Sequence, residues 1–92
     1  MILVLGGTLD SRQLTEALLA NGKSVCYSSL TNIASDRMPE HCLLTKISGL
    51  LDGITLRETM TVYNVNLCID ATHPYAREIS ENAIWACDAM NV

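Results

Sequence analysis

The sequence opens with a run of five apolar residues, Met1-Ile2-Leu3-Val4-Leu5, that ends at Gly6-Gly7. Because every position in the run is apolar, a strand formed there would need both of its faces buried. A central strand of a parallel sheet meets that condition, since helices cover the sheet on both sides. The run therefore predicts an α/β fold in which this strand lies inside the sheet.

The next segment, residues 10–22, predicts a helix. It begins with Asp10 and Gln13, which have the form of a capping box, and it reaches Gly22 where a helix is expected to end. Residues 24–28 then read as a second short strand. Strand, glycine turn, helix and strand together form a βαβ unit, the building block of a parallel sheet.

The same alternation continues to the end of the chain. After a polar loop over residues 29–41, the pattern predicts a strand at 42–47, a helix at 54–65, a strand at 66–70 and a helix at 76–90. The last helix is expected to bury one face made of Ile79, Ala83, Ala86, Cys87 and Met90. We therefore predict a Rossmann-like α/β domain over residues 1–92, with an open, mostly parallel sheet of about four strands and helices on both faces.

Composition excludes several classes of function. The 92 residues are 49% hydrophobic and 17% charged, which suits one packed domain and argues against disorder. The net charge is −4 and the six Lys and Arg residues are scattered, so neither nucleic acid nor an anionic membrane surface is an expected partner. With no signal-peptide or spanning pattern, we expect the cytoplasm.

The four cysteines do not indicate a metal site. None belongs to a Cys-x-x-Cys pair, and three lie in apolar segments, which is typical of buried reduced thiols. His41-Cys42 is a pair of possible ligands without a second pair, so no metal is predicted.

Ligands of an open parallel sheet bind beyond the carboxyl ends of its strands. Gly6-Gly7-Thr8 lies there and leads into a helix, whose N-terminus offers free N–H groups to a phosphate. The full Gly-x-Gly-x-x-Gly spacing is absent, and Gly-Gly after a strand also serves as a plain tight turn. Both interpretations remain open from the residues alone.

Ser28 and Ser29 follow the second strand, where folds that prefer NAD place an acid against the ribose. No acid occurs there before Asp36, and the hydroxyls with nearby Arg37 favour NADP over NAD. The alternative is that the two serines simply cap or turn the chain.

A third candidate, Asp70-Ala71-Thr72-His73-Pro74-Tyr75, follows the strand at 66–70. Asp70 ends an apolar strand and needs partners such as Thr72 or His73. Pro74 restricts His73 to extended conformations, and an imidazole held in one direction can exchange a proton or bind a carboxylate. A helix entry capped by Thr72 fits the same residues equally well.

Two segments carry a family resemblance. "ILVLGGTLDSRQL" at residues 2–14 and "IDATHPYAREISENA" at residues 69–83 resemble the N-terminal half of the precorrin-6A reductase family of cobalamin biosynthesis. The resemblance implies that a macrocyclic double bond of precorrin-6A, or of its cobalt-containing counterpart, is reduced to the dihydro precorrin-6B form. It also implies hydride transfer from NADPH or NADH, and two Rossmann-like domains with the active site between them.

The resemblance also implies roles for individual residues. Gly6, Gly7 and Thr8 match the pyrophosphate-binding turn, and Ser28, Ser29 and Asp70 join them as cofactor-binding residues. The catalytic residues implied at the cleft are Thr72, His73 and Tyr75. The corrinoid precursor carries many carboxylates, for which His73 and Arg77 are the expected donors.

Family members are longer than this chain. We therefore expect the 92 residues to be the N-terminal half of a two-domain reductase, completed by a C-terminal domain or a partner chain and of little activity alone. The alternative is a non-catalytic, flavodoxin-like nucleotide-binding or interaction module.

Overall fold

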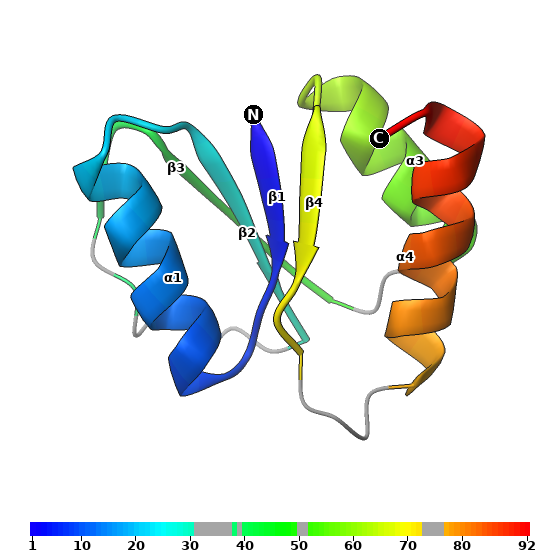
Figure 1. Ribbon diagram of the computed structural model, residues 1–92, viewed down its shortest axis with the longest axis horizontal. Helices are drawn as coiled ribbons and strands as arrows, with labels where there is room; N and C mark the ends of the chain where they lie inside the picture. The colour runs from blue at the N-terminus through cyan, green and yellow to red at the C-terminus, as the bar shows by residue number, and fades with distance from the viewer. Residues whose placement is uncertain (31–37, 39, 50–51, 73–76) are drawn as a thin grey trace.

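The computed structural model describes residues 1–30, 38, 40–49, 52–72 and 77–92. Its elements, in chain order, are β1 (Ile2–Leu5), α1 (Leu9–Ala20), β2 (Val25–Ser29), β3 (Leu44–Ser48), α3 (Gly53–Val62), β4 (Leu67–Asp70) and α4 (Arg77–Met90) (Figure 1). Each strand and helix predicted from the sequence is present, with its ends moved by up to three residues.

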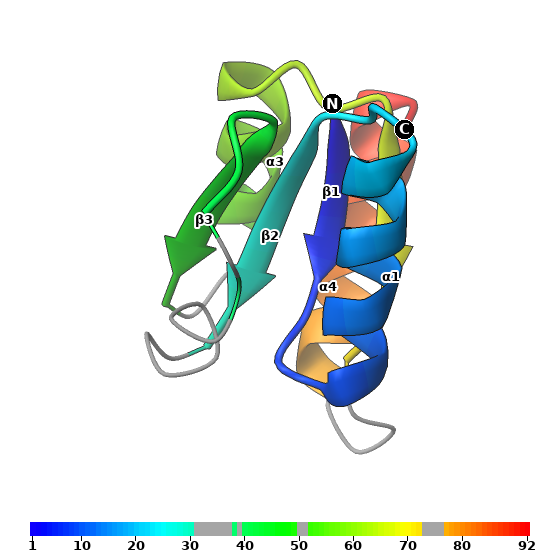
Figure 2. The ribbon, with the colours of Figure 1, turned by 90° about the vertical axis from the view of Figure 1, so that its left-hand side faces the viewer.

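The strands form one parallel sheet in the order β3-β2-β1-β4. β1 lies inside it, where Ile2 is paired with Val25 of β2 on one side and with Leu67 of β4 on the other. Figure 2 shows β3, β2 and β1 side by side with the same direction. Because β2 and β3 lie on one side of β1 and β4 lies on the other, the order of strands reverses between β1 and β4.

Helices cover both faces of the sheet, as predicted: α1 lies on one face, and α3 and α4 lie on the other (Figure 1). The core beside α3 and α4 is built from Leu3, Leu5, Cys26, Leu56, Met60, Val65, Ala83 and Ala86. The core beside α1 is built from Val4, Leu19, Val25, Tyr27 and Met38. Alternate residues of β1 enter the two cores, which explains why its run is apolar at every position.

The predicted start of α1 is wrong. The capping box is formed by Thr8 and Ser11 instead of Asp10 and Gln13, and the helix begins at Leu9. The Ser11 N–H donates to Thr8 Oγ1 and the Thr8 N–H donates to Ser11 Oγ, both at 3.0 Å. The Thr8–Ser11 pair therefore forms the reciprocal capping bonds that were predicted for Asp10 and Gln13, two residues earlier in the chain.

α3 was predicted at 54–65 and extends over Gly53–Val62. Its threonines do not interrupt it, and the hydroxyls of Thr59 and Thr61 donate to the carbonyls four residues earlier, at 2.8 and 3.0 Å. The helix ends before Asn64, whose φ of 52° lies in the left-handed region that asparagine tolerates.

α4 buries the face that was predicted. Ala83 and Ala86 are in the core beside α3, and Ile79, Cys87 and Met90 pack against that core as partly buried residues. The first turn of α4 adjoins the carboxyl end of β4, where the Ser80 hydroxyl donates to the Asp70 carboxylate.

Candidate functional site

The turns that follow β1 and β4 lie side by side at the carboxyl edge of the sheet (Figure 1). The Ala71 N–H donates to the carbonyl of Leu5 at 3.0 Å, which extends the β1–β4 ladder by one bond beyond the strands. Strand order reverses between these two strands, and ligands of doubly wound sheets bind in the crevice outside that reversal. Topology therefore brings together two of the three segments predicted to form a site.

Thr8 joins the two turns. Its hydroxyl donates to the carbonyl of Ala71 at 2.8 Å and accepts the N–H of Ser11 at 3.0 Å. The one hydroxyl proton is therefore engaged, and a ligand that accepts from Thr8 has to displace the Ala71 carbonyl. In this structure Thr8 caps α1 and fixes the distance between the two turns.

Gly6 and Gly7 are glycines for different reasons. A Cβ at Gly6 would lie 2.4 Å from ring carbons of Tyr27, so space excludes any side chain there. Gly7 has a φ of 103°, which L side chains rarely adopt, and no atom of the described residues lies within 4 Å of a Cβ placed there. The Gly7 position is thus open to an approaching group, whereas Gly6 is packed against the protein itself.

Tyr27 lies in β2 and contacts this turn, and the sequence pattern did not single it out. It is fully buried in β2, its hydroxyl oxygen accepts the Gly7 N–H at 2.9 Å, and it lies 3.1 Å from Ser11 Oγ. The available signal was one large aromatic side chain in a buried strand of otherwise small residues, because a buried Tyr hydroxyl needs a hydrogen-bond partner.

Two N–H groups of α1 have no acceptor inside the helix. The capping box engages those of Thr8 and Ser11, and the N–H groups of Leu9 and Asp10 remain at the first two helical positions. They carry the positive end of the helix dipole, which favours an anion. Asp10 places a carboxylate in the same turn, and this charge opposes an anion.

Ser28 and Ser29 end β2 beside this turn and are almost wholly buried, at 5% and 3% exposure. Their carbonyls accept the N–H groups of Gly6 at 2.7 Å and Gly49 at 3.0 Å. Their predicted role at a ribose remains a prediction, as does that of Arg37, which lies outside the described residues.

Asp70 ties the end of β4 to the first turn of α4. Its carboxylate accepts the Thr72 N–H at 3.1 Å, the Thr72 hydroxyl and the Ser80 hydroxyl. Partial burial acts to raise the Asp70 pKa, but the hydrogen bonds from Ser80 and Thr72 outweigh it and hold the pKa below its usual value. Asp70 is therefore ionised at neutral pH, and Thr72 is confirmed as its partner.

The other predicted catalytic residues, His73 and Tyr75, lie outside the described residues, as does Pro74. The described chain resumes at Arg77, the exposed first residue of α4. The Asp70–Ser80 bond thus joins the residues on either side of this segment.

The cysteines are free thiols and differ in exposure. Burial raises the pKa of the Cys26 thiol to about 11, and burial together with Cys87 and Asp70 raises that of Cys68 to about 12. Cys42 is exposed, with its Sγ 3.9 Å from His41 Nδ1, and that nitrogen accepts the Leu43 N–H at 3.0 Å. Within the described part of the chain, no three His, Cys, Asp or Glu side chains converge in a way that would hold a metal ion.

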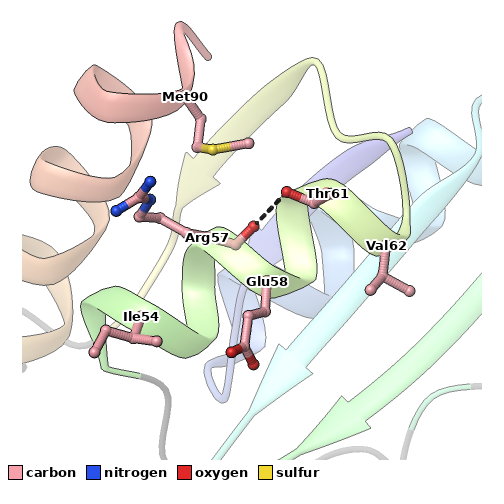
Figure 3. Close-up of a pocket in the computed structure, with 6 residues that line it drawn as sticks. All are labelled: Ile54, Arg57, Glu58, Thr61, Val62 and Met90. Carbon is pink, nitrogen blue, oxygen red and sulfur yellow. Dashed lines mark hydrogen bonds between the residues drawn. The ribbon is translucent and has the colours of Figure 1, made fainter.

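A separate groove of about 340 Å³ lies along α3 and the end of α4 (Figure 3). It is lined by Ile54, Arg57, Glu58, Thr61, Val62 and Met90. None of these is a predicted site residue.

Among the described residues, no helix is long and apolar enough to cross a membrane.

The reversed strand order and the helix N-terminus at its crevice define a doubly wound α/β domain of the kind that binds ligands at its carboxyl edge. The family model described as precorrin-6x reductase CbiJ/CobK matches residues 1–92, and the chain belongs to this family.

Three relatives show the extent of the likeness. The chain is 34% identical to a cobalt-precorrin-6A reductase of Methanocaldococcus jannaschii, covering 99% of this chain and 36% of that protein. It is 34% identical to a precorrin-6A reductase of a Sinorhizobium species, covering 99% and 34%. A solved structure of CobK precorrin-6A reductase matches with a TM-score of 0.81 and 32% identity, covering 99% of this chain and 36% of that one. The chain thus spans 34–36% of the length of these relatives.

Proposed function

We propose that the protein takes part in the reduction of a macrocyclic double bond of precorrin-6A, or of cobalt-precorrin-6A, by hydride transfer from NADPH or NADH. The observation that carries this proposal is the contact between two turns at the strand reversal, where the Thr8 hydroxyl donates a hydrogen bond to the Ala71 carbonyl. The glycine turn ends at a helix N-terminus, and the Asp70–Thr72 segment leads to His73. Membership of the reductase family supports the substrate and the type of reaction.

The residues at the helix N-terminus fit a dinucleotide. The Leu9 and Asp10 N–H groups can bind a phosphate, and Gly7 leaves open space beside them. Ser28 and Ser29 lie on the β2 side, where the ribose of a dinucleotide is expected, and their hydroxyls favour NADPH. The nicotinamide, when bound, supplies the hydride.

The residues after β4 are proposed to bind and orient the substrate. Asp70 is ionised and accepts hydrogen bonds from both the N–H and the hydroxyl of Thr72, so the residue immediately before His73 is held in place. His73, Thr72 and Tyr75 are the proposed catalytic residues, and His73 with Arg77 provides donors for substrate carboxylates.

We further propose that the 92 residues form a single Rossmann-like domain at the N-terminal side of a two-domain reductase. The relatives extend well beyond the length matched here. A second domain, or a partner chain, would then close the cleft over the turns after β1 and β4 and complete the activity.

Titration of the chain with NADPH and NADH, followed by nicotinamide fluorescence, tests the cofactor proposal. Leu9→Pro is the informative variant, because it removes one of the two N–H groups at a helical position where proline is tolerated. The preceding residue, Thr8, already has the extended backbone that proline requires, with φ −118° and ψ 164°. Leu9→Ala is the matched control, since it loses the same exposed side chain and keeps the N–H.

We expect saturable binding to the unchanged chain, weaker binding to Leu9→Pro and unchanged binding to Leu9→Ala. Asp10→Asn is expected to bind more tightly, because it removes a negative charge beside the phosphate. Absence of binding at millimolar concentrations of both nucleotides would reject the proposal and favour a non-catalytic module. In a full-length reductase, His73→Ala is expected to impair turnover more than cofactor affinity.

A further inference from the structure

The hydroxyl groups around the glycine turn form a chain of hydrogen bonds with a defined direction. Ser11 Oγ donates to the Thr8 carbonyl at 2.7 Å, which uses its one proton. The 3.1 Å contact between Ser11 Oγ and Tyr27 Oη must then use the proton of Tyr27. Tyr27 Oη is left as an acceptor, and the Gly7 N–H donates to it at 2.9 Å.

This chain of bonds fixes the turn from a neighbouring strand. The Tyr27 ring fills the space beside Gly6, where a Cβ would lie 2.4 Å away, and its hydroxyl holds the N–H of Gly7. Gly7 has a φ of 103°, and a glycine has many other conformations of similar energy. The bond to Tyr27 therefore selects one conformation of the turn immediately before the N–H groups of Leu9 and Asp10.

We propose that Tyr27 is a positioning residue for the nucleotide, acting through the turn without touching the ligand. The inference rests on the proposed cofactor site after β1. When the turn is already ordered, binding of the nucleotide does not have to reduce the conformational entropy of the turn. The affinity therefore depends on the Tyr27 hydroxyl, although this group does not touch the nucleotide.

Tyr27→Phe tests this inference, because it keeps the ring beside Gly6 and removes only the hydroxyl. Thr15→Val is the matched control: Thr15 is equally buried, and its hydroxyl donates to the Ser11 carbonyl within α1 at 2.8 Å. Tyr27→Phe loses the hydrogen bonds of its hydroxyl to Gly7 and Ser11, whereas Thr15→Val loses one buried hydrogen bond within α1 and leaves the contacts with the turn in place. We expect Tyr27→Phe to weaken NADPH binding by about tenfold and Thr15→Val by less than about twofold.

Hydrogen exchange at the Gly7 amide provides a readout that does not depend on the nucleotide. We expect exchange at Gly7 to become faster in Tyr27→Phe and to remain unchanged in Thr15→Val, while amides in β1 remain protected in both. Unchanged nucleotide affinity and unchanged Gly7 exchange in Tyr27→Phe would each overturn the inference. If the unchanged chain binds neither nucleotide, the proposed cofactor is rejected, and Gly7 exchange still decides whether Tyr27 holds the turn.

Discussion

Replacing Gly6 by alanine should destabilise the protein through a single contact. The added Cβ would lie 2.4 Å from Tyr27 Cε2 and Cζ and 2.7 Å from its hydroxyl oxygen. Tyr27 is fully buried in β2 between β1 and β3, so its ring has little room to move. Either the ring or the turn has to shift, and both shifts weaken the bond from the Gly7 N–H.

Two contributions set the size of the effect. Overpacking a well-packed core costs about 1–3 kcal/mol. Loss of the Gly7–Tyr27 hydrogen bond adds about 0.5–1.5 kcal/mol. We therefore expect Gly6→Ala to lower the free energy of unfolding by about 1.5–4.5 kcal/mol, a large share of the total for a domain of this size.

Urea denaturation followed by circular dichroism measures this change, and a second substitution identifies its cause. In a Tyr27→Val background the space beside Gly6 is empty, so Gly6→Ala should cost at least about 1 kcal/mol less than in the unchanged chain. In a Tyr27→Phe background the ring carbons remain, and most of the cost should persist. A cost below about 1 kcal/mol in the unchanged chain, or an equal cost in the Tyr27→Val background, would refute the steric argument.

Three further predictions concern other parts of the structure. Thr8→Val should lower the free energy of unfolding by about 1–2 kcal/mol, because it removes the cap of α1 and the hydrogen bond to Ala71. Thr8→Ser should retain most of the stability, and thermal unfolding distinguishes the two variants. Hydrogen bonds, led by that from the Thr55 N–H, hold the pKa of Asp52 below its usual value, and that of Asp70 is also lowered. The two carboxylates therefore stabilise the fold above the unfolded-state pKa of about 3.9, and this stabilisation is lost as the pH falls through their lower folded-state pKa values. Urea titrations from pH 6 to pH 3 should show a smaller decrease in the free energy of unfolding for Asp70→Asn than for the unchanged chain. An equal decrease would contradict this assignment. A thiol reagent at pH 8, followed by mass spectrometry, should modify the exposed Cys42 first and Cys26 and Cys68 slowly. The reason is that burial raises the pKa of the Cys26 and Cys68 thiols to about 11 and about 12. Early labelling of Cys26 would argue against the core as described.

The fold was largely predictable because its strongest signals are local. A fully apolar run at residues 1–5 requires an interior strand, and β1 is interior. Helical spacing identified the buried face of α4 without any knowledge of its partner. Helix ends were less predictable, because Thr8-Ser11 and Asp10-Gln13 both satisfy the rules for a cap and only the geometry of the preceding turn selects between them.

The position of the two turns at the carboxyl edge of the sheet could be predicted from the sequence, but their hydrogen bonds could not. The rule for carboxyl ends of parallel strands indicated the turns after β1 and β4, but their contact depends on the strand order, which the sequence pattern does not encode. Thr8 meets Ala71 across 63 residues, and Tyr27 meets Gly7 across 20 residues. Such contacts depend on register and on the direction of side chains in the folded sheet. The sequence could therefore not show that the Thr8 hydroxyl donates to the Ala71 carbonyl, and the assignment of Thr8 to a cofactor remains a prediction.

Mapping NADPH binding on the ¹⁵N-labelled chain by NMR tests the central claim most directly, because each backbone amide reports its own environment. We predict saturable shifts at Gly7, Leu9 and Asp10, smaller shifts at Ser28 and Ser29, and none in the α3 groove around Arg57 and Glu58. Shifts confined to that groove, or no shifts at millimolar NADPH, would contradict the assignment of the turn after β1 as the nucleotide site.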